Sequence, residues 1–187
     1  MSDVERIIIK DKVFRKFITK SEISASVEKL AGRINRDYEG RTPMILVVMK
    51  GAMIFAADLV RHLNLQCEME VISAKSYGSG MTTSGDVKIA DFGAKFAGKD
   101  IIIIEDIVDT GLTLKALFRN VLMHNPASLS AAAIISKPDS REVEVDLKYI
   151  GIEVPPYFIV GYGLDYAEQG RNLPDIYILD NEVVLMK

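Results

Sequence analysis

The chain of 187 residues is long enough for one domain with a sizeable core, and its 49% hydrophobic and 26% charged residues are typical of a soluble globular protein. A net charge of −3 argues against a large nonspecific nucleic-acid surface. The single cysteine, Cys67, excludes an internal disulfide and favours a reducing, cytoplasmic setting. No segment predicts a signal peptide or a membrane span, so no membrane partner is expected.

Hydrophobic periodicity predicts strands that alternate with helices. Ile7–Ile9 predicts a short strand, and the capping-box pattern from Thr19 to Glu22 predicts the start of a helix. Further strands are predicted at 44–49, 67–73, 101–104, 129–135, 148–152, 158–160 and 176–179, and further helices at 55–63 and 114–122. This order predicts a single α/β domain over residues 1–187, with a twisted parallel sheet flanked by helices and ligands bound beyond the carboxyl ends of its strands.

The stretch 101–114 carries the strongest functional pattern. Four isoleucines predict a strand buried on both faces, and acidic residues and a small polar loop separate it from the next helix. Gly111 and the N–H groups at a helix start favour a phosphate, and Thr110 and Thr113 add hydroxyl donors. Glu105 and Asp106 beside an anion site suit sugar hydroxyls or a metal ion. A phosphorylated sugar bound with Mg²⁺ would suit both the phosphate-binding loop and the acidic residues before it. The alternative is a plain strand-to-helix turn capped by Asp and Thr.

The sequence Glu-Asp-x-x-Asp-Thr-Gly-x-Thr at 105–113 resembles the phosphoribosyl pyrophosphate (PRPP) motif of type I phosphoribosyltransferases. The resemblance implies the fold of that family, with a small hood built from the terminal segments. It also implies that Asp109 acts as general base on the purine. The PRPP- and phosphate-binding residues implied are Glu105, Asp106, Asp109, Thr110, Gly111, Leu112, Thr113, Lys50 and Gly51.

Two further segments resemble parts of the pyrophosphate site in this family. Lys50-Gly51 follows a buried strand and is similar to a loop whose peptide bond before the Lys is cis in relatives, although Met49 stands where Leu is usual. Residues 75–88 resemble the flexible catalytic loop, which implies that Ser76 and Tyr77 close over the leaving pyrophosphate. The alternatives are a tight turn with an exposed Lys for the first segment and a mobile surface loop that does not close for the second.

The purine side of the site is implied by Lys137 and by residues 156–171. Lys137, which alone would be interpreted as a surface lysine, corresponds to a donor to the oxygen at C6 of a 6-oxopurine. Phe158 is similar to the ring that stacks on the purine, and Arg171 to the catalytic Arg that grips pyrophosphate. The implied purine group is Lys137, Phe158, Ile159 and Asp165, and the implied metal group is Glu105, Asp106 and Asp165.

Together these patterns resemble the hypoxanthine-guanine phosphoribosyltransferases of purine salvage, which transfer a phosphoribosyl group from PRPP to hypoxanthine or guanine and release pyrophosphate. The resemblance implies Mg²⁺ as cofactor, PRPP and a 6-oxopurine base as substrates, and a homodimer or homotetramer. Alternatives are a xanthine or pyrimidine phosphoribosyltransferase, or a nucleotide-sensing regulator that binds RNA. The acidic balance of the chain argues against a nucleic-acid partner.

Overall fold

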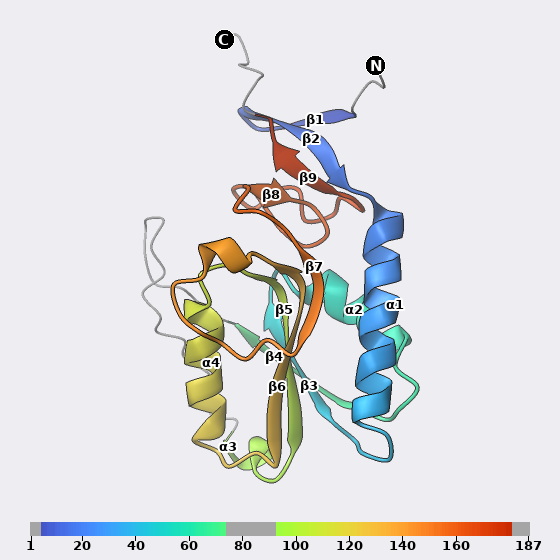
Figure 1. Cartoon of the computed structure of the whole chain (residues 1–187), viewed down its shortest axis with the longest axis vertical. Helices are drawn as coiled ribbons and strands as arrows, with labels where there is room; N and C mark the ends of the chain where they lie inside the picture. Colours follow the sequence, from blue (N-terminus) through green and yellow to red (C-terminus); the bar gives the residue numbers. More distant parts are fainter. Residues whose placement is uncertain (1–4, 74–92, 181–187) are drawn as a thin grey trace.

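A five-stranded parallel sheet forms the body of the molecule (Figure 1). The computed structural model describes residues 5–73 and 93–180. The sheet has the strand order β4-β3-β5-β6-β7, with all neighbours parallel. Its strands are β3 (Met44–Met49), β4 (Glu68–Ser73), β5 (Asp100–Val108), β6 (Ser128–Ser136) and β7 (Tyr149–Glu153). The predicted parallel sheet is therefore confirmed.

Helices cover both faces of this sheet (Figure 1). Helices α1 (Lys20–Asp37) and α2 (Met53–Arg61) lie on one face, and α3 (Gly93–Phe96) and α4 (Leu112–Leu122) lie on the other. The isoleucine run of β5 serves both faces, because alternate side chains of a strand point in opposite directions. Ile102 and Ile104 pack with α1 and α2, whereas Ile101 and Ile103 pack with α4.

The first long helix begins as its sequence predicts. The Glu22 N–H donates to Thr19 Oγ1 at 3.3 Å, and the Thr19 N–H donates to Glu22 Oε2 at 2.8 Å. These two hydrogen bonds satisfy N–H groups that have no partner within the first turn of the helix. The capping box therefore fixes the residue at which α1 begins.

A second, antiparallel sheet lies over the carboxyl ends of the parallel strands, and we call it the hood (Figure 1). Its strand order is β1-β2-β9-β8, from β1 (Arg6–Ile9), β2 (Lys12–Ile18), β9 (Ile176–Leu179) and β8 (Ile159–Val160). The implied hood is confirmed. Strand β2 is not predicted from the sequence, because Val13 and Phe14 are both buried and a register shift between Lys16 and Ile18 breaks the alternation.

Several boundaries differ from the sequence-based expectation, and the largest difference concerns β5. Strand β5 continues to Val108, so Glu105 and Asp106 lie within the strand and not beyond its end. Helix α2 ends at Arg61, two residues before the expected end. Within residues 5–73 and 93–180, no helix combines the length and the apolar character that crossing a membrane requires.

Candidate active site

The residues singled out from the sequence gather at the carboxyl ends of β3, β5 and β6. Lys50-Gly51 follows β3, the loop 109–111 follows β5, and Lys137 follows β6. The Lys137 N–H donates to the Val108 carbonyl at 3.0 Å, which holds two of these strand ends together. Along the chain, β3 connects outward to β4, whereas β5 connects to β6 on the other side. The site therefore lies where the strand order changes direction, the usual ligand position in open α/β sheets.

The predicted phosphate loop lines a cavity of about 290 Å³. Thr110, Gly111 and Thr113 form part of its wall, at the start of the 11-residue helix α4. Gly111 has φ +87°, a left-handed conformation that glycine adopts without steric cost. A Cβ here would also lie 3.0 Å from the Val143 carbonyl oxygen, so the local packing favours glycine as well. The cavity therefore lies at the start of a helix, a position that favours an anion.

Glu105 and Asp106 point to opposite sides of β5, because they are consecutive residues of a strand. Glu105 lines the phosphate cavity and is 6% exposed. Burial and the neighbouring charge of Asp106 raise the pKa of Glu105 well above its ordinary value. Burial also raises the pKa of Asp106, although the Ile107 N–H, which donates to Asp106 Oδ1 at 2.9 Å, and the charge of Arg171 oppose that rise.

Asp106 explains why glycine follows Lys50. A Cβ on Gly51 would lie 1.7 Å from Asp106 Oδ2, so only glycine leaves room for that carboxylate. A Cβ on Gly163 would lie 2.1 Å from the Gly51 carbonyl oxygen. Two backbone segments and one carboxylate thus meet closely at this point. The Met49–Lys50 peptide bond is cis, as the resemblance implies.

Lys137 lies beside the predicted general base. Its Nζ donates to Asp109 Oδ2 at 3.0 Å, and the lysine is 7% exposed, so the interpretation as a surface lysine is wrong. Arg141, which the sequence analysis does not identify, donates to the Asp109 carbonyl at 2.7 Å and to Ser136 Oγ at 3.0 Å. The site therefore presents a cationic donor and a carboxylate acceptor side by side, on a backbone that Arg141 holds.

Arg171 and Asp165 form a second ion pair in the loop between β8 and β9. Arg171 NH2 lies 2.7 Å from Asp165 Oδ1, and NH1 donates to the Gly163 carbonyl at 2.9 Å. Among the described residues, Arg171 Nε is buried without a hydrogen-bond partner. Glu168, also absent from the sequence-based set, approaches both Arg171 and Lys50. No local pattern could identify these roles, because the contacts of Glu168 with Lys50 and of Arg141 with the Asp109 carbonyl join segments that are distant in the sequence.

Three aromatic rings, those of Phe14, Phe158 and Tyr166, contact one another at the hood. Phe158 precedes β8 and is 47% exposed, with its ring 5.8 Å from that of Tyr166 in an edge-on arrangement and 6.2 Å from that of Phe14. Ile159 is buried within β8 and pairs with Ile178 of β9. Phe158 thus offers a partly open aromatic surface whose position is fixed by other rings.

Two of the implied catalytic residues cannot be placed. Ser76 and Tyr77, with the whole loop 75–88, lie outside the described residues. Their closure over pyrophosphate stays a prediction.

The three implied metal ligands do not form a closed metal cage. In the described part of the chain, no group of three or more His, Cys, Asp or Glu side chains is arranged to hold a metal ion. The reason is the strand geometry, which sends Glu105 and Asp106 to opposite sides. Asp165 is close enough for its charge to raise the pKa of Asp106. Such a pair fits Mg²⁺, which usually takes one or two protein carboxylates and completes its shell with water and phosphate.

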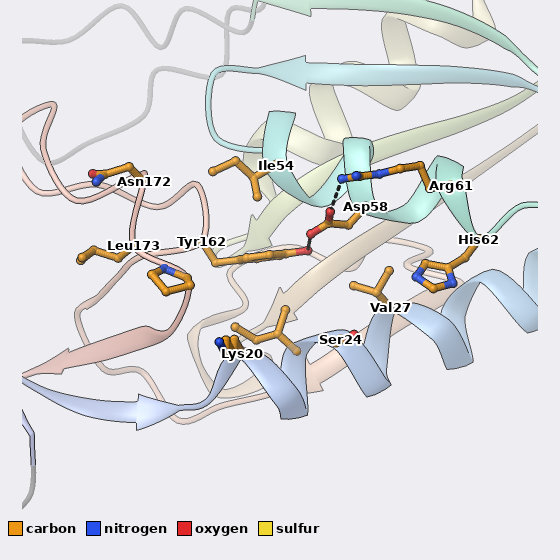
Figure 2. A pocket seen from close by; sticks show the side chains of 12 residues that line it. Lys20, Ser24, Val27, Ile54, Asp58, Arg61, His62, Tyr162, Asn172 and Leu173 are labelled. Atoms are coloured by element: carbon orange, nitrogen blue, oxygen red, sulfur yellow. Dashed lines mark hydrogen bonds and ion pairs between the residues drawn. The ribbon is translucent and has the colours of Figure 1, made fainter.

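A larger cavity, about 540 Å³, lies between α1, α2 and residues 172–174, and Figure 2 shows its lining. It contains none of the predicted site residues. Tyr162 OH donates to Asp58 Oδ2 at 2.7 Å, and Arg61 donates to Asp58 Oδ1 at 2.6 Å (Figure 2). This network ties the segment that carries Asp165 and Arg171 to α2. The smaller cavity at the phosphate loop is the better candidate, because it combines a helix start with ionisable groups.

Comparison with known proteins agrees with this geometry. Residues 18–167 match the phosphoribosyl transferase domain, and the chain belongs to this family. It is 38% identical to the hypoxanthine-guanine phosphoribosyltransferase of Bacillus subtilis (strain 168) over 173 residues, covering 92% of this chain and 96% of that protein.

It is also 40% identical over 167 residues to the bifunctional protein TilS/HprT of Listeria monocytogenes. That match covers 89% of this chain and 26% of the relative, so the chain spans about a quarter of the bifunctional protein. The crystal structure of a hypoxanthine-guanine phosphoribosyltransferase from Bacillus anthracis, with a HEPES molecule in its active site, superimposes with a TM-score of 0.81. It is 40% identical, and the match covers 87% of this chain and 96% of that one.

Proposed function

We propose that the chain transfers the 5-phosphoribosyl group of PRPP to hypoxanthine or guanine, giving IMP or GMP and pyrophosphate. Family membership and the two hypoxanthine-guanine relatives support this reaction class. The observation that carries the choice of base is the Lys137–Asp109 pair beside the phosphate loop. A 6-oxopurine presents an acceptor, O6, and a ring nitrogen, N7, on adjacent positions of one edge, which suits a lysine and a carboxylate at hydrogen-bond distance from each other.

The sugar and its phosphate would occupy the cavity at the start of α4. The loop Asp109–Thr113 would hold the 5′-phosphate through backbone N–H groups and the hydroxyls of Thr110 and Thr113. Glu105 and Asp106 would hold the ribose hydroxyls. The negative charge of these carboxylates also suits the cationic character that the sugar gains as its bond to pyrophosphate breaks.

The leaving group would lie between Lys50-Gly51 and Arg171. The guanidinium of Arg171 and the Lys50 ammonium would neutralise the pyrophosphate as it departs. Asp106 and Asp165 would hold Mg²⁺, which when bound supplies further positive charge to the leaving group.

The base would bind against Phe158, with the Ile159 backbone reading its edge. Lys137 would donate to O6. As purine N9 forms its bond to C1 of the ribose, the bond from C1 to the pyrophosphate oxygen breaks, and the N7 proton passes to Asp109. Ser76 and Tyr77 would exclude water from this step when the loop 75–88 closes.

A competition assay tests the function. Hypoxanthine, guanine, xanthine and adenine are supplied together with PRPP and Mg²⁺, and the nucleotides formed are separated and quantified. We expect IMP and GMP as the main products and little AMP, because the C6 amino group of adenine would meet the donor of Lys137. Preferential formation of xanthosine monophosphate, or no nucleotide from any base, would contradict the proposal.

Lys137→Met tests the choice of base directly. Losing a charged donor to O6 should raise the KM for hypoxanthine by about tenfold or more, while the KM for PRPP changes less than about threefold. Lys29→Met, on the exposed side of α1, is the control for removing a lysine charge. If both substrates weaken equally, Lys137 is structural.

Two further features belong to the proposal. We expect a homodimer or homotetramer, since Met69 and Val71 are half exposed on β4, an edge strand of the parallel sheet. Light scattering during size-exclusion chromatography measures the molecular mass of the assembly and so tests this expectation. A cytoplasmic setting fits a chain with one cysteine and nucleotide substrates.

A further inference from the structure

The carboxylate of Glu168 lies between the two cations that would grip pyrophosphate. Its Oε2 is 3.0 Å from Lys50 Nζ and 3.6 Å from Arg171 NH2. These cations come from two separate segments, the loop after β3 and the loop before β9. An exposed glutamate is ionised at neutral pH, so this carboxylate can pair with both cations.

The backbone that presents Glu168 is a tight turn. Tyr166 and Gln169 exchange backbone hydrogen bonds of 2.9 and 3.1 Å, and the two residues between them, Ala167 and Glu168, have φ of +50° and +67°. Left-handed conformations at both central positions favour Asn and Gly, and they are unfavourable for Ala and Glu. The Glu168 N–H donates to Asp165 Oδ2 at 2.8 Å, which anchors the turn to the Arg171 ion pair. Local preference therefore does not explain a glutamate here, which points to a use for its side chain.

Pyrophosphate and Glu168 would compete for the same donors. Both are anions, and the oxygen atoms of pyrophosphate would need the Lys50 and Arg171 positions that the carboxylate approaches. The Glu168 side chain is 67% exposed, so it can turn into water at little cost when a more highly charged ligand arrives. Its return would help to displace the product.

We propose that Glu168 is a displaceable carboxylate that pairs with Lys50 and Arg171 in the empty site and competes with pyrophosphate for them. This inference rests on the proposed function, because it takes Lys50 and Arg171 as the pyrophosphate grip. Glu168 keeps the two cations near each other between turnovers, weakens pyrophosphate binding and speeds its release. Glu168 is thus a positioning residue that acts through Lys50 and Arg171.

Calorimetric titration with magnesium pyrophosphate tests the role. Glu168→Gln removes the charge and keeps the shape, and it should lower the pyrophosphate Kd about two- to fivefold, the range of an exposed ion pair. Product inhibition by pyrophosphate should strengthen by the same factor. Glu168→Gly suits the left-handed backbone and should show the same tightening without any risk to the turn. Glu28→Gln, on the exposed side of α1, controls for the change in net charge.

Failure of the role of Glu168 and failure of the proposed function would give different results. If both Glu168 variants still form IMP but bind pyrophosphate as the wild type does or more weakly, the role of Glu168 is overturned and the proposed function stands. If pyrophosphate binding tightens in both variants but the wild-type chain forms no nucleotide from PRPP and any base, the proposed function fails and the competition by Glu168 stands.

Discussion

Asp109 is held at both its side chain and its backbone, so neighbouring residues determine where its carboxylate lies. Lys137 donates to the side chain, and Arg141 donates to the Asp109 backbone carbonyl. Such charge-assisted hydrogen bonds restrict where a proton acceptor can lie relative to a bound base. At the scale of single residues, the position of Asp109 therefore depends on Lys137 and Arg141, which lie outside the PRPP motif.

Asp109→Asn is the residue-scale prediction. The amide keeps the size of the side chain but cannot accept the N7 proton, so we expect kcat to fall by about 10²–10⁴-fold. The KM for PRPP should change by less than about threefold. Steady-state kinetics at saturating hypoxanthine measure both values, with the exposed Asp146→Asn as control. An unchanged kcat would remove Asp109 from the chemical step.

At the scale of elements, Asp175 joins the hood to the body of the molecule. It precedes β9, pairs with Lys16 of β2 at 2.9 Å and accepts the N–H of Lys20, the first residue of α1, at 2.7 Å. Burial acts to raise the pKa of Asp175, but the hydrogen bonds from Lys16 and Lys20 bring it below its ordinary value. One carboxylate thus connects two hood strands and a helix.

Asp175→Asn should lower Tm by about 3–8 °C at pH 7, because it replaces charge-assisted hydrogen bonds in a chain of this size. A depressed carboxyl pKa stabilises the folded state above the ordinary value of about 3.9, and this stabilisation is lost as pH falls through the folded-state pKa. The Tm difference between wild type and variant should therefore shrink below about pH 4. Thermal unfolding from pH 2 to 8 measures it, with the exposed Glu144→Gln as control. A difference that is constant with pH would exclude this charge-based role.

Elements could be predicted from the sequence where one local pattern dominates. The isoleucine run, the capping box and the terminal strand at 176–179 all occur as predicted. Strand β2 and the true end of β5 could not be predicted, because a register shift and two carboxylates within the strand obscure the usual patterns. In the site, motif residues could be located, whereas Arg141 and Glu168 depend on contacts that form only when separate segments meet.

At the scale of the whole molecule, the site lies between the parallel sheet and the hood. The phosphate loop and Lys137 belong to the sheet, whereas Phe158 and Arg171 belong to the segments that form and join the hood strands. A ligand that contacts both parts would stabilise their association. Substrate binding should therefore be visible as resistance to unfolding of the entire chain.

PRPP with Mg²⁺ should raise Tm by about 5–10 °C at a ligand concentration near 100 times its Kd, which corresponds to ~2.7 kcal/mol. PRPP with EDTA should give a clearly smaller rise, because the pyrophosphate would then lack part of its counter-charge. Differential scanning fluorimetry measures both. Equal shifts with and without Mg²⁺ would contradict the metal assignment, and no shift in either buffer would contradict the PRPP site.

The hood also determines when the site can first exist during protein synthesis. Strand β9 pairs with β2 and β8, and the Leu179 N–H donates to the Phe158 carbonyl at 2.9 Å. Translation adds about 5–20 residues per second, and a nascent chain folds from its N-terminal part first. A ribosome-bound chain with a complete parallel sheet therefore still lacks the strand that pairs with β8 and with the Phe158 backbone, and the proposed purine site would be complete only after β9 has emerged.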